Sequence, residues 1–353
     1  MICYLRVFTT GGGFHIDRSM SPADRRVQEL GDWLQSAGIT AAEIVPASED
    51  ASFRRYFRVH TPEGSRIVMD APPDREDSRP FVEIAGYLEQ IGVNAPRVLA
   101  SDLTRGFLLL TDLGSLPYLT ELARNPARAD ALYGDALEAL SRIQERGRAL
   151  QHRLPPYDER LLSFELSLFR DWLCGRHLGI ELAGEREAAW NACCALLLDN
   201  ALEQPRVFVH RDYHSRNLMV TGQDNPGILD FQDAVEGPLT YDVVSLLKDC
   251  YVRWPAERVH DWVLGWFSRL DRSLTQGMRD AELLGRFELM GVQRHLKAAG
   301  IFARLCHRDG KRGYLEDVPR TLRYIVEVAP RHPELACLAA LIEEEILPRM
   351  GAA

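Results

Sequence analysis

Two carboxylates and one amide lie close together in a segment of short apolar runs. Asp212 is followed five residues later by Asn217, and Asp230 directly follows Ile228-Leu229. Short strands around these residues would bring the three side chains to one edge. Carboxylate and amide oxygens are hard ligands that suit Mg²⁺, and a carboxylate left off the metal can position a hydroxyl. Kinase-type phosphoryl transfer requires this division of roles.

Three short predicted strands would position these residues, at Val207–Val209, Leu218–Val220 and Gly227–Leu229. Upstream, residues 43–112 are predicted to form a small mixed lobe with the order β-β-β-α-β-β. Its strands are expected at Glu43–Pro46, Phe53–His60, Ser65–Asp70, Arg97–Ser101 and Gly106–Thr111, and its helix at Pro80–Ile91. Helical spacing predominates after Leu119, in segments near 126–149, 158–178, 184–203, 239–270 and 279–308. This order predicts an α+β chain with a β-rich first lobe, residues 20–113, and a larger helical lobe, residues 114–353.

The first 19 residues lack a periodic apolar face and contain a glycine triplet. We expect residues 1–19 to be a disordered or mis-started extension, with Met20 as the alternative start. Ser21 and Pro22 then have the types of an N-cap and a first helical residue. The apolar spacing that follows predicts a helix with Val27, Leu30 and Leu34 on one face.

The composition is that of an ordinary globular protein. Of 353 residues, 46% are hydrophobic and 26% charged, which excludes a disordered chain, a collagen-like fibre and a disulfide scaffold. The net charge of −9 disfavours nucleic acid and anionic membranes as partners, and no obligatory protein partner is evident. The seven cysteines include no C-x-x-C pair, which predicts a cytoplasmic protein with free thiols.

The segment containing Asp212 resembles a known catalytic loop. His210-Arg-Asp212-Tyr-His214-Ser-Arg-Asn217 is similar to the H-x-D-x-H-x-x-N loop of the aminoglycoside phosphotransferase and choline kinase branch of the protein-kinase-like fold. Asp230-Phe-Gln-Asp233 resembles that branch's counterpart of D-F-G, and residues 237–244 resemble the helix start that follows it. The resemblance covers roughly residues 25–330. It implies a bilobal protein-kinase-like fold that uses ATP and Mg²⁺.

The resemblance also implies roles for individual residues. Asp212 would be the base that positions the acceptor hydroxyl, and Asn217 and Asp230 would hold Mg²⁺. The backbone of Thr111, Asp112 and Leu113 would bind the adenine edge of the nucleotide. Supporting or acceptor-side roles would fall to His210, Glu83, Asp242 and His214.

One family feature is missing. The family places a lysine on the third strand of the first lobe, whereas the only lysines here are Lys248, Lys297 and Lys311. Met69 occupies the expected position. The remaining candidates for contacting phosphates are Ser48, Ser52, Arg54, Arg55 and Arg58. The missing lysine leaves open a nucleotide-binding pseudokinase that acts as a regulator.

The acceptor follows from a closer resemblance, carried by residues 52–59, by Leu229-Asp-Phe-Gln-Asp-Ala234 and by residues 294–305. These are similar to the bacterial anomeric kinases of peptidoglycan recycling, which convert N-acetylmuramate and N-acetylglucosamine to their 1-phosphates. Arg304, Arg308 and Lys311 lie in a basic segment that suits the lactyl carboxylate of N-acetylmuramate. Other acceptors remain open within the fold, namely an aminoglycoside, choline or homoserine.

Overall fold

The computed structural model describes residues 22–39, 43–49 and 53–351, although side-chain placement is not described for residues 22–24, 48 and 49. The predictions made for residues 1–19, for the N-cap at Ser21 and for Ser52 lie outside this part of the chain. The described chain divides into two compact units. The N-terminal unit runs to Gln90 and includes Asn94–Ser115; the C-terminal unit comprises Ile91–Val93 and everything from Leu116.

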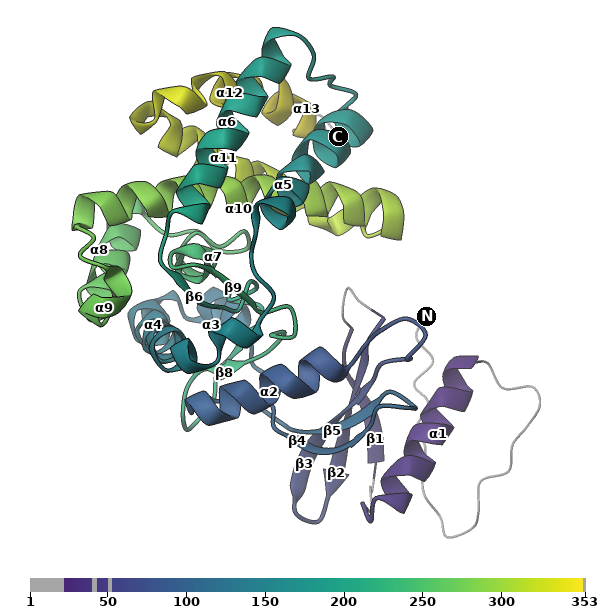
Figure 1. Cartoon of the computed structure of the whole chain (residues 1–353). Coiled ribbons are helices and arrows are strands. Elements are labelled where there is room, and N and C mark those ends of the chain that lie inside the picture. Colours follow the sequence, from purple (N-terminus) through teal and green to yellow (C-terminus); the bar gives the residue numbers. More distant parts are fainter. Residues whose placement is uncertain (1–21, 40–42, 50–52, 352–353) are drawn as a thin grey trace. The chain divides into compact units, whose positions relative to one another are not determined.

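The N-terminal unit contains an antiparallel sheet (Figure 1). Its strand order is β1-β2-β3-β5-β4, formed by β1 (Glu43–Glu49), β2 (Arg55–Thr61), β3 (Gly64–Asp70), β5 (Phe107–Thr111) and β4 (Val98–Asp102). Two helices accompany the sheet, α1 (Pro22–Ser36) and α2 (Arg79–Ile91). After α1, the observed order β-β-β-α-β-β is the predicted one, because apolar alternation and the Thr61–Gly64 turn are local signals.

Helix α1 covers one face of this sheet. Leu30, Trp33 and Leu34 pack there against a cluster of sheet residues, Phe57, Val59, Val68, Phe107 and Leu109. The strand register explains the set, because Phe57 lies opposite Val68 and successive residues of a strand alternate between faces. The same register places Arg55 opposite Asp70 on the face that α1 covers.

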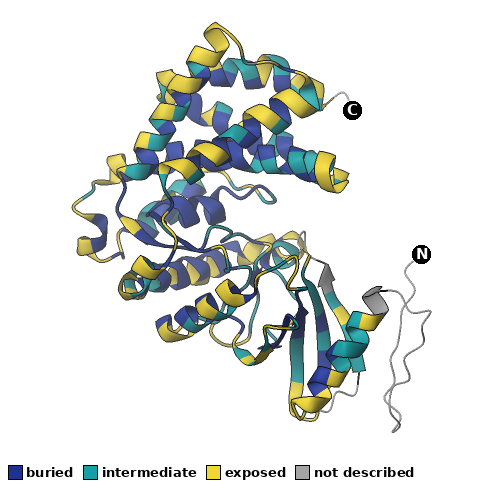
Figure 2. Cartoon of the chain, turned by 45° about the vertical axis from the view of Figure 1, so that its right-hand side comes forward, coloured by how far each residue is buried: buried dark blue, intermediate teal, exposed yellow. Residues whose placement is uncertain are grey.

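The C-terminal unit is mainly helical. Its principal helices are α3 (Tyr118–Arg124), α4 (Ala129–Arg146), α5 (Glu159–Leu168), α6 (Glu185–Leu202), α7 (Tyr241–Leu247), α8 (Ala256–Phe267), α9 (Arg272–Thr275), α10 (Asp280–Asp309), α11 (Val318–Val328), α12 (Ala336–Leu341) and α13 (Leu347–Met350). A π-helical segment, η4 (Phe169–Leu178), continues α5, and a 3₁₀ segment, η5 (Arg312–Asp317), follows α10. Helix α10 is in contact with α5, α6, α7 and α11, and its middle is buried (Figure 2).

The first strand of this unit does not pair with the strand that follows it in the sequence. β7 (Leu218–Met219) pairs with β8 (Gly227–Ile228), whereas β6 (Arg206–Val209) pairs with β9 (Val235–Pro238), which was not predicted. A strand containing glycine and proline has little β propensity, so this pairing partner leaves no local signal. The helix expected over 239–270 was also wrong as one element, because residues 248–255 separate α7 from α8. No helix in the described part of the chain is long and apolar enough to cross a membrane.

Candidate active site

Asp212, Asn217 and Asp230 lie together in the C-terminal unit. Asn217 donates from Nδ2 to the backbone oxygen of Asp212 at 3.0 Å and to Oδ2 of Asp230 at 3.3 Å. Asp230 has a φ of +62°, an uncommon conformation for a residue with a side chain. Its Oδ1 accepts a hydrogen bond from Gln232 Nε2 at 2.9 Å. The Asn217 amide therefore joins the loop that carries Asp212 to the segment that carries Asp230.

Asp242 holds the start of the catalytic loop. Its Oδ2 accepts a hydrogen bond from the backbone N–H of His210 at 2.6 Å, and its Oδ1 accepts one from Arg211 at 3.0 Å. Arg211 has a φ of +78°, so these contacts fix a backbone conformation that the residue would not adopt readily by itself. Asp242 is completely buried in the first turn of α7, and burial raises its pKa to about 7. Asp242 therefore lies beneath the start of the loop and holds its backbone.

The two histidines of the motif form contacts within the loop and with its surroundings. The buried His210 ring accepts a hydrogen bond at Nδ1 from the backbone N–H of Asp212 at 3.3 Å, and burial lowers the pKa of His210 to about 4. A neutral ring at physiological pH can accept this bond. His214 donates from its backbone N–H to the Asp212 carbonyl at 3.1 Å, and its ring meets the Tyr251 ring edge-on at 5.5 Å.

A buried charged network lies behind the loop, and the sequence analysis missed it. Glu165 on α5 accepts at Oε1 from Arg211 Nη2 at 2.5 Å and from Lys297 Nζ at 2.9 Å. Tyr157 and Gln293 donate to its other oxygen, Gln293 at 3.2 Å. Lys297 also donates to the Tyr241 hydroxyl at 2.8 Å. The rarity of lysine in this chain was the one available signal for Lys297.

Positive charges from α10 and the loop act on Asp212. Burial tends to raise the pKa of the Asp212 carboxyl, but positive charge led by Lys297, with Arg294 contributing, holds the pKa below its usual value. Asp212 is therefore ionised at neutral pH. An ionised carboxylate can align a hydroxyl group and accept its proton.

A second buried carboxylate, Asp249, holds the middle of the loop. Its Oδ2 accepts from the backbone N–H of Ser215 at 3.0 Å and from the Ser215 hydroxyl at 2.5 Å. Its Oδ1 accepts from the backbone N–H of Tyr251 at 2.9 Å. Sequence reasoning missed Asp249 as well, because it lies in the irregular segment that was predicted as helix.

In the N-terminal unit, each of the three arginines that were predicted to contact phosphate lies next to a carboxylate. Arg58 binds Asp112 through Nε at 2.6 Å and through Nη2 at 3.0 Å, and Nη2 also donates to the Gly114 carbonyl at 2.8 Å. Burial tends to raise the pKa of Asp112, but hydrogen bonds led by that from Arg58 lower it. Arg58 thus stabilises the segment that follows Thr111 and contains Leu113. Arg54 lies 3.7 Å from Glu76.

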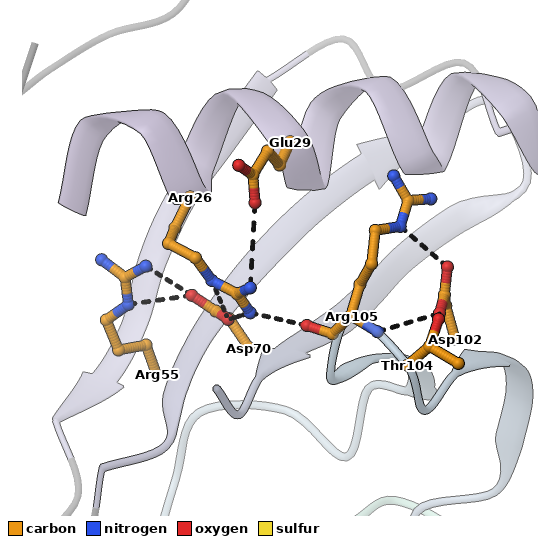
Figure 3. A network of polar contacts seen from close by, with 7 residues as sticks. All are labelled: Arg26, Glu29, Arg55, Asp70, Asp102, Thr104 and Arg105. Carbon is orange, nitrogen blue, oxygen red and sulfur yellow. Dashed lines mark hydrogen bonds and ion pairs between the residues drawn. The ribbon is translucent and has the colours of Figure 1, made fainter. Parts of the chain in front are cut away.

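Arg55 belongs to a different group of contacts (Figure 3). The Asp70 carboxylate lies between Arg55 and Arg26, and Arg55 Nε donates to Asp70 Oδ2 at 3.0 Å while Arg26 Nε donates to Oδ1 at 3.1 Å. Asp70 is completely buried. Arg26 comes from α1 and also donates to the Arg105 carbonyl at 2.8 Å. This group therefore joins α1 to the sheet.

The remaining predicted residues of the N-terminal unit are Met69, Glu83 and Ser48. Met69 is completely buried on β3, so the position expected for the family's lysine holds an apolar core residue. Glu83 is exposed on α2 and accepts a hydrogen bond from the Tyr87 hydroxyl. Ser48 lies within β1, with its side chain outside the described part.

The three predicted substrate cations lie near the C-terminal end of α10 and just after it. Arg308 is exposed and pairs with Asp309 at 2.8 Å, and Lys311 follows the end of α10. Arg304 is partly buried one turn before Arg308. Because an α-helix rises 1.5 Å per residue, Arg308 is about 16 Å along α10 from Lys297. The basic residues of α10 that act on Asp212 are Lys297 and Arg294.

A loop with Asp, Asn and a second Asp in this arrangement, together with a five-stranded antiparallel sheet and a helical second part, defines a phosphotransferase of the bilobal protein-kinase-like class. Residues 43–284 match the phosphotransferase enzyme family, and the chain belongs to that family. It is an enzyme that transfers phosphate to a hydroxyl acceptor.

Curated relatives resemble the chain over nearly its whole length. One from Pseudomonas aeruginosa, named N-acetylmuramate/N-acetylglucosamine kinase, is 51% identical over 333 residues, covering 90% of this chain and 96% of the relative. A relative of the same name from Neisseria meningitidis is 40% identical, covering 91% of this chain and 96% of its own.

Solved structures share the fold at low sequence identity. A choline/ethanolamine kinase family protein from Mesorhizobium loti has a TM-score of 0.61 at 16% identity. The match covers 90% of this chain and 98% of that protein's chain. The ADP-bound aminoglycoside phosphotransferase APH(2'')-Ib has a TM-score of 0.56 at 16% identity, covering 84% and 97%. At this identity the likeness shows the fold alone.

Proposed function

We propose that the protein phosphorylates the anomeric hydroxyl of N-acetylmuramate and N-acetylglucosamine with ATP, yielding sugar 1-phosphates in peptidoglycan recycling. The observation that carries this proposal is 51% identity, over nearly the full length, to a relative named for these two sugars. The geometry of the loop is compatible with it, because Asp212, Asn217 and Asp230 are arranged as a phosphotransferase requires.

Asp212 orients the anomeric hydroxyl and accepts its proton as the oxygen attacks the γ-phosphorus of ATP. The bond from the γ-phosphorus to the β,γ-bridging oxygen breaks, and ADP leaves. Its lowered pKa keeps it ionised for this role. Asp242 and Asp249 fix the backbone on either side of Asp212, so the carboxylate is in place before the substrate binds. Such preorganisation lowers the entropic part of the activation barrier.

The residues present fit a Mg²⁺ ion. Asn217 uses its amide nitrogen in both of its side-chain hydrogen bonds, so its Oδ1 is the atom left for a metal, beside the Asp230 carboxylate. Two hard oxygen ligands from the protein, supplemented by phosphate oxygens and water, are a usual Mg²⁺ environment. When bound, Mg²⁺ would neutralise charge on the phosphoryl group being transferred.

Nucleotide binding belongs to the same proposal. Solved relatives in this fold are complexes with ADP and AMP. Here the backbone of Thr111, Asp112 and Leu113 binds adenine, and Arg58 fixes this segment through Asp112. One of Arg54, Arg55 and Arg58, or the Ser48–Ser52 segment, takes the role of the absent lysine. Arg55 or Arg58 would have to exchange its carboxylate for a phosphate to do so.

The test is ADP release by the full-length protein with N-acetylmuramate, N-acetylglucosamine, choline and gentamicin as separate acceptors. We expect turnover with the two amino sugars, none with their methyl glycosides, and a 1-phosphate by phosphorus NMR. A 6-phosphate product, or turnover of a methyl glycoside, would end the anomeric assignment. Nucleotide binding without turnover of any acceptor would favour the regulatory pseudokinase.

A further inference from the structure

A group of aromatic side chains surrounds Arg216, which directly precedes Asn217 in the catalytic loop. The Arg216 guanidinium carbon lies 4.7 Å from the ring centre of Tyr251 and 5.6 Å from that of Tyr314. Tyr314 stacks on Phe302 at 5.6 Å, and Tyr251 lies 6.2 Å from Phe302. We call these four residues the Arg216 shelf. They converge from the loop, the segment after α7, α10 and η5.

The Arg216 shelf extends from the protein interior to the surface. Phe302 is buried, Tyr251 and Tyr314 are partly buried, and Arg216 is exposed. His214, two residues from Asp212, meets Tyr251 edge-on. The shelf is therefore continuous with the loop that holds the reacting groups.

The Arg216 guanidinium forms no ion pair with a carboxylate in the described part of the chain, whereas Arg308 and Arg320 do. The neighbouring acids are engaged elsewhere: Asp317 pairs with Arg320 at 2.7 Å, and Asp249 accepts from Ser215 and Tyr251. The guanidinium also hydrogen-bonds to the hydroxyls of Tyr251 and Tyr314, and its five N–H donors outnumber these two acceptors. A planar carboxylate is the group that such a fork binds through two parallel hydrogen bonds.

We propose that Arg216 binds the lactyl carboxylate of N-acetylmuramate, with Tyr251 and Tyr314 holding the guanidinium in place for it. This inference rests on the proposed function. N-acetylglucosamine lacks the lactyl group, so Arg216 is a specificity residue that favours one of the two sugars.

The position of Arg216 supports this assignment. Arg216 lies in the catalytic loop itself, directly before Asn217, whereas Arg308 is exposed near the C-terminal end of α10 and pairs with Asp309.

The experiment compares Arg216→Gln and Arg308→Gln with Arg323→Gln, a control on the exposed side of α11. KM and kcat are measured for both sugars and for ATP, and circular dichroism checks folding. In Arg216→Gln, the ratio of KM for N-acetylmuramate to KM for N-acetylglucosamine should rise about 10-fold or more, because a desolvated charge pair is lost. Arg216→Lys should give a smaller rise, since an ammonium cannot bind a carboxylate as a fork. Arg323→Gln should leave the ratio unchanged.

Several outcomes would overturn the assignment while leaving the proposed function standing. An Arg216→Gln variant that loses both sugars equally has only a structural defect, and one that raises KM for ATP has lost a phosphate contact. A selective rise in Arg308→Gln alone would move the carboxylate site to the end of α10. If the wild-type protein neither binds nor phosphorylates N-acetylmuramate, the proposed function fails and the assignment fails with it.

Discussion

Nζ of Lys297 lies 2.9 Å from Oε1 of Glu165, and both side chains are almost completely buried. Arg211 Nη2 reaches the same oxygen at 2.5 Å. One carboxylate thus pairs with two cations in a region of low dielectric, and one of those cations precedes Asp212 in the chain. The network connects α5 and α10 to the catalytic loop.

Replacing Glu165 by Gln should destabilise the protein strongly. The change keeps the shape but leaves Lys297 and Arg211 without a counter-charge, and breaking a buried pair in this way costs about 3–5 kcal/mol. Urea unfolding measures the change in the free energy of unfolding. Glu159→Gln, an exposed change in the same helix, is the control and should stay within about 0.5 kcal/mol of wild type. Equal stability of the two variants would show that Glu165 does not hold the network together.

Asp212→Asn should abolish turnover without unfolding the protein. The amide preserves the shape but cannot accept the hydroxyl proton, so kcat should fall about 100-fold or more. Steady-state kinetics and nucleotide titration separate this loss from weakened ATP binding, which should change little. Asp199→Asn, exposed on α6, is the matched control. Retention of more than about a tenth of wild-type kcat would remove Asp212 from the catalytic role.

The aspartates of Figure 3 offer a matched pair of substitutions. Asp70→Asn leaves Arg26 and Arg55 without the fully buried carboxylate between them and should lower stability by about 2–4 kcal/mol. Asp102→Asn removes a pair with Arg105 whose side chains are 22% and 41% exposed, and should cost about 1 kcal/mol or less. Thermal unfolding of both variants gives the comparison. A larger effect at Asp102 would contradict this view of how α1 is attached.

Two glycines of α10 should respond in opposite ways to alanine. A methyl group at Gly300 would overlap the backbone of Leu168 and Phe169, where α5 passes into η4, so Gly300→Ala should destabilise the fold. No atom outside the helix lies within 4 Å of the same methyl at Gly285. Gly285→Ala should therefore gain about 0.5–1 kcal/mol from helix propensity. Chemical denaturation distinguishes the two, and a stable Gly300→Ala variant would mean that α10 and α5 can separate.

Stability should depend on pH through His295. Its Nε2 donates to the Lys248 carbonyl at 2.8 Å, its ring stacks on Tyr324 at 4.6 Å, and burial lowers its pKa to about 3. In the unfolded chain, histidine titrates near a pKa of about 6.5. Between these values the unfolded state binds a proton that the folded state does not, so the free energy of unfolding rises with pH. This contribution is lost as pH falls below about 6.5, by up to about 1.4 kcal/mol per pH unit.

His295→Gln removes this titration. The slope of unfolding free energy against pH, measured by urea denaturation between pH 4.5 and 6.5, should be smaller in the variant by about one proton, whatever its absolute stability. His152→Gln, at an exposed position, should keep the wild-type slope. An unchanged slope in His295→Gln would show that the ring is protonated inside the folded protein.

Local signals in the sequence predicted much of this structure, and long-range contacts were the main omission. Alternation and turn residues were enough for the strands up to Thr111, and the spacing of Asp212, Asn217 and Asp230 marked the site. Glu165 could not be found in this way, because it meets Lys297 only through the packing of α5 against α10. Asp249 was hidden in a segment whose apolar periodicity suggested a continuous helix.

The arginines of β2 show a related limit of prediction from sequence. The sequence showed cations at Arg55 and Arg58, and the absence of a lysine made them candidates for binding phosphate. It could not show that the register places Arg55 opposite Asp70, nor that Arg58 reaches Asp112, 54 positions later in the chain. Each carboxylate partner lies on another strand or at its end, so no local pattern identifies it.

The length of α10 also constrains how the sequence can change. Gln293, Lys297 and Gly300 are spaced by four and three residues, which places them on one side of the helix, toward α5 and η4. Each residue turns an α-helix by 100°, so inserting a single residue between Lys297 and Gly300 would rotate Gly300 and Phe302 away from their neighbours while leaving Lys297 in place. Substitutions in this helix can be absorbed one at a time, but a change in its length cannot. We therefore expect homologous chains to vary in length in the loops and to keep α10 free of insertions and deletions.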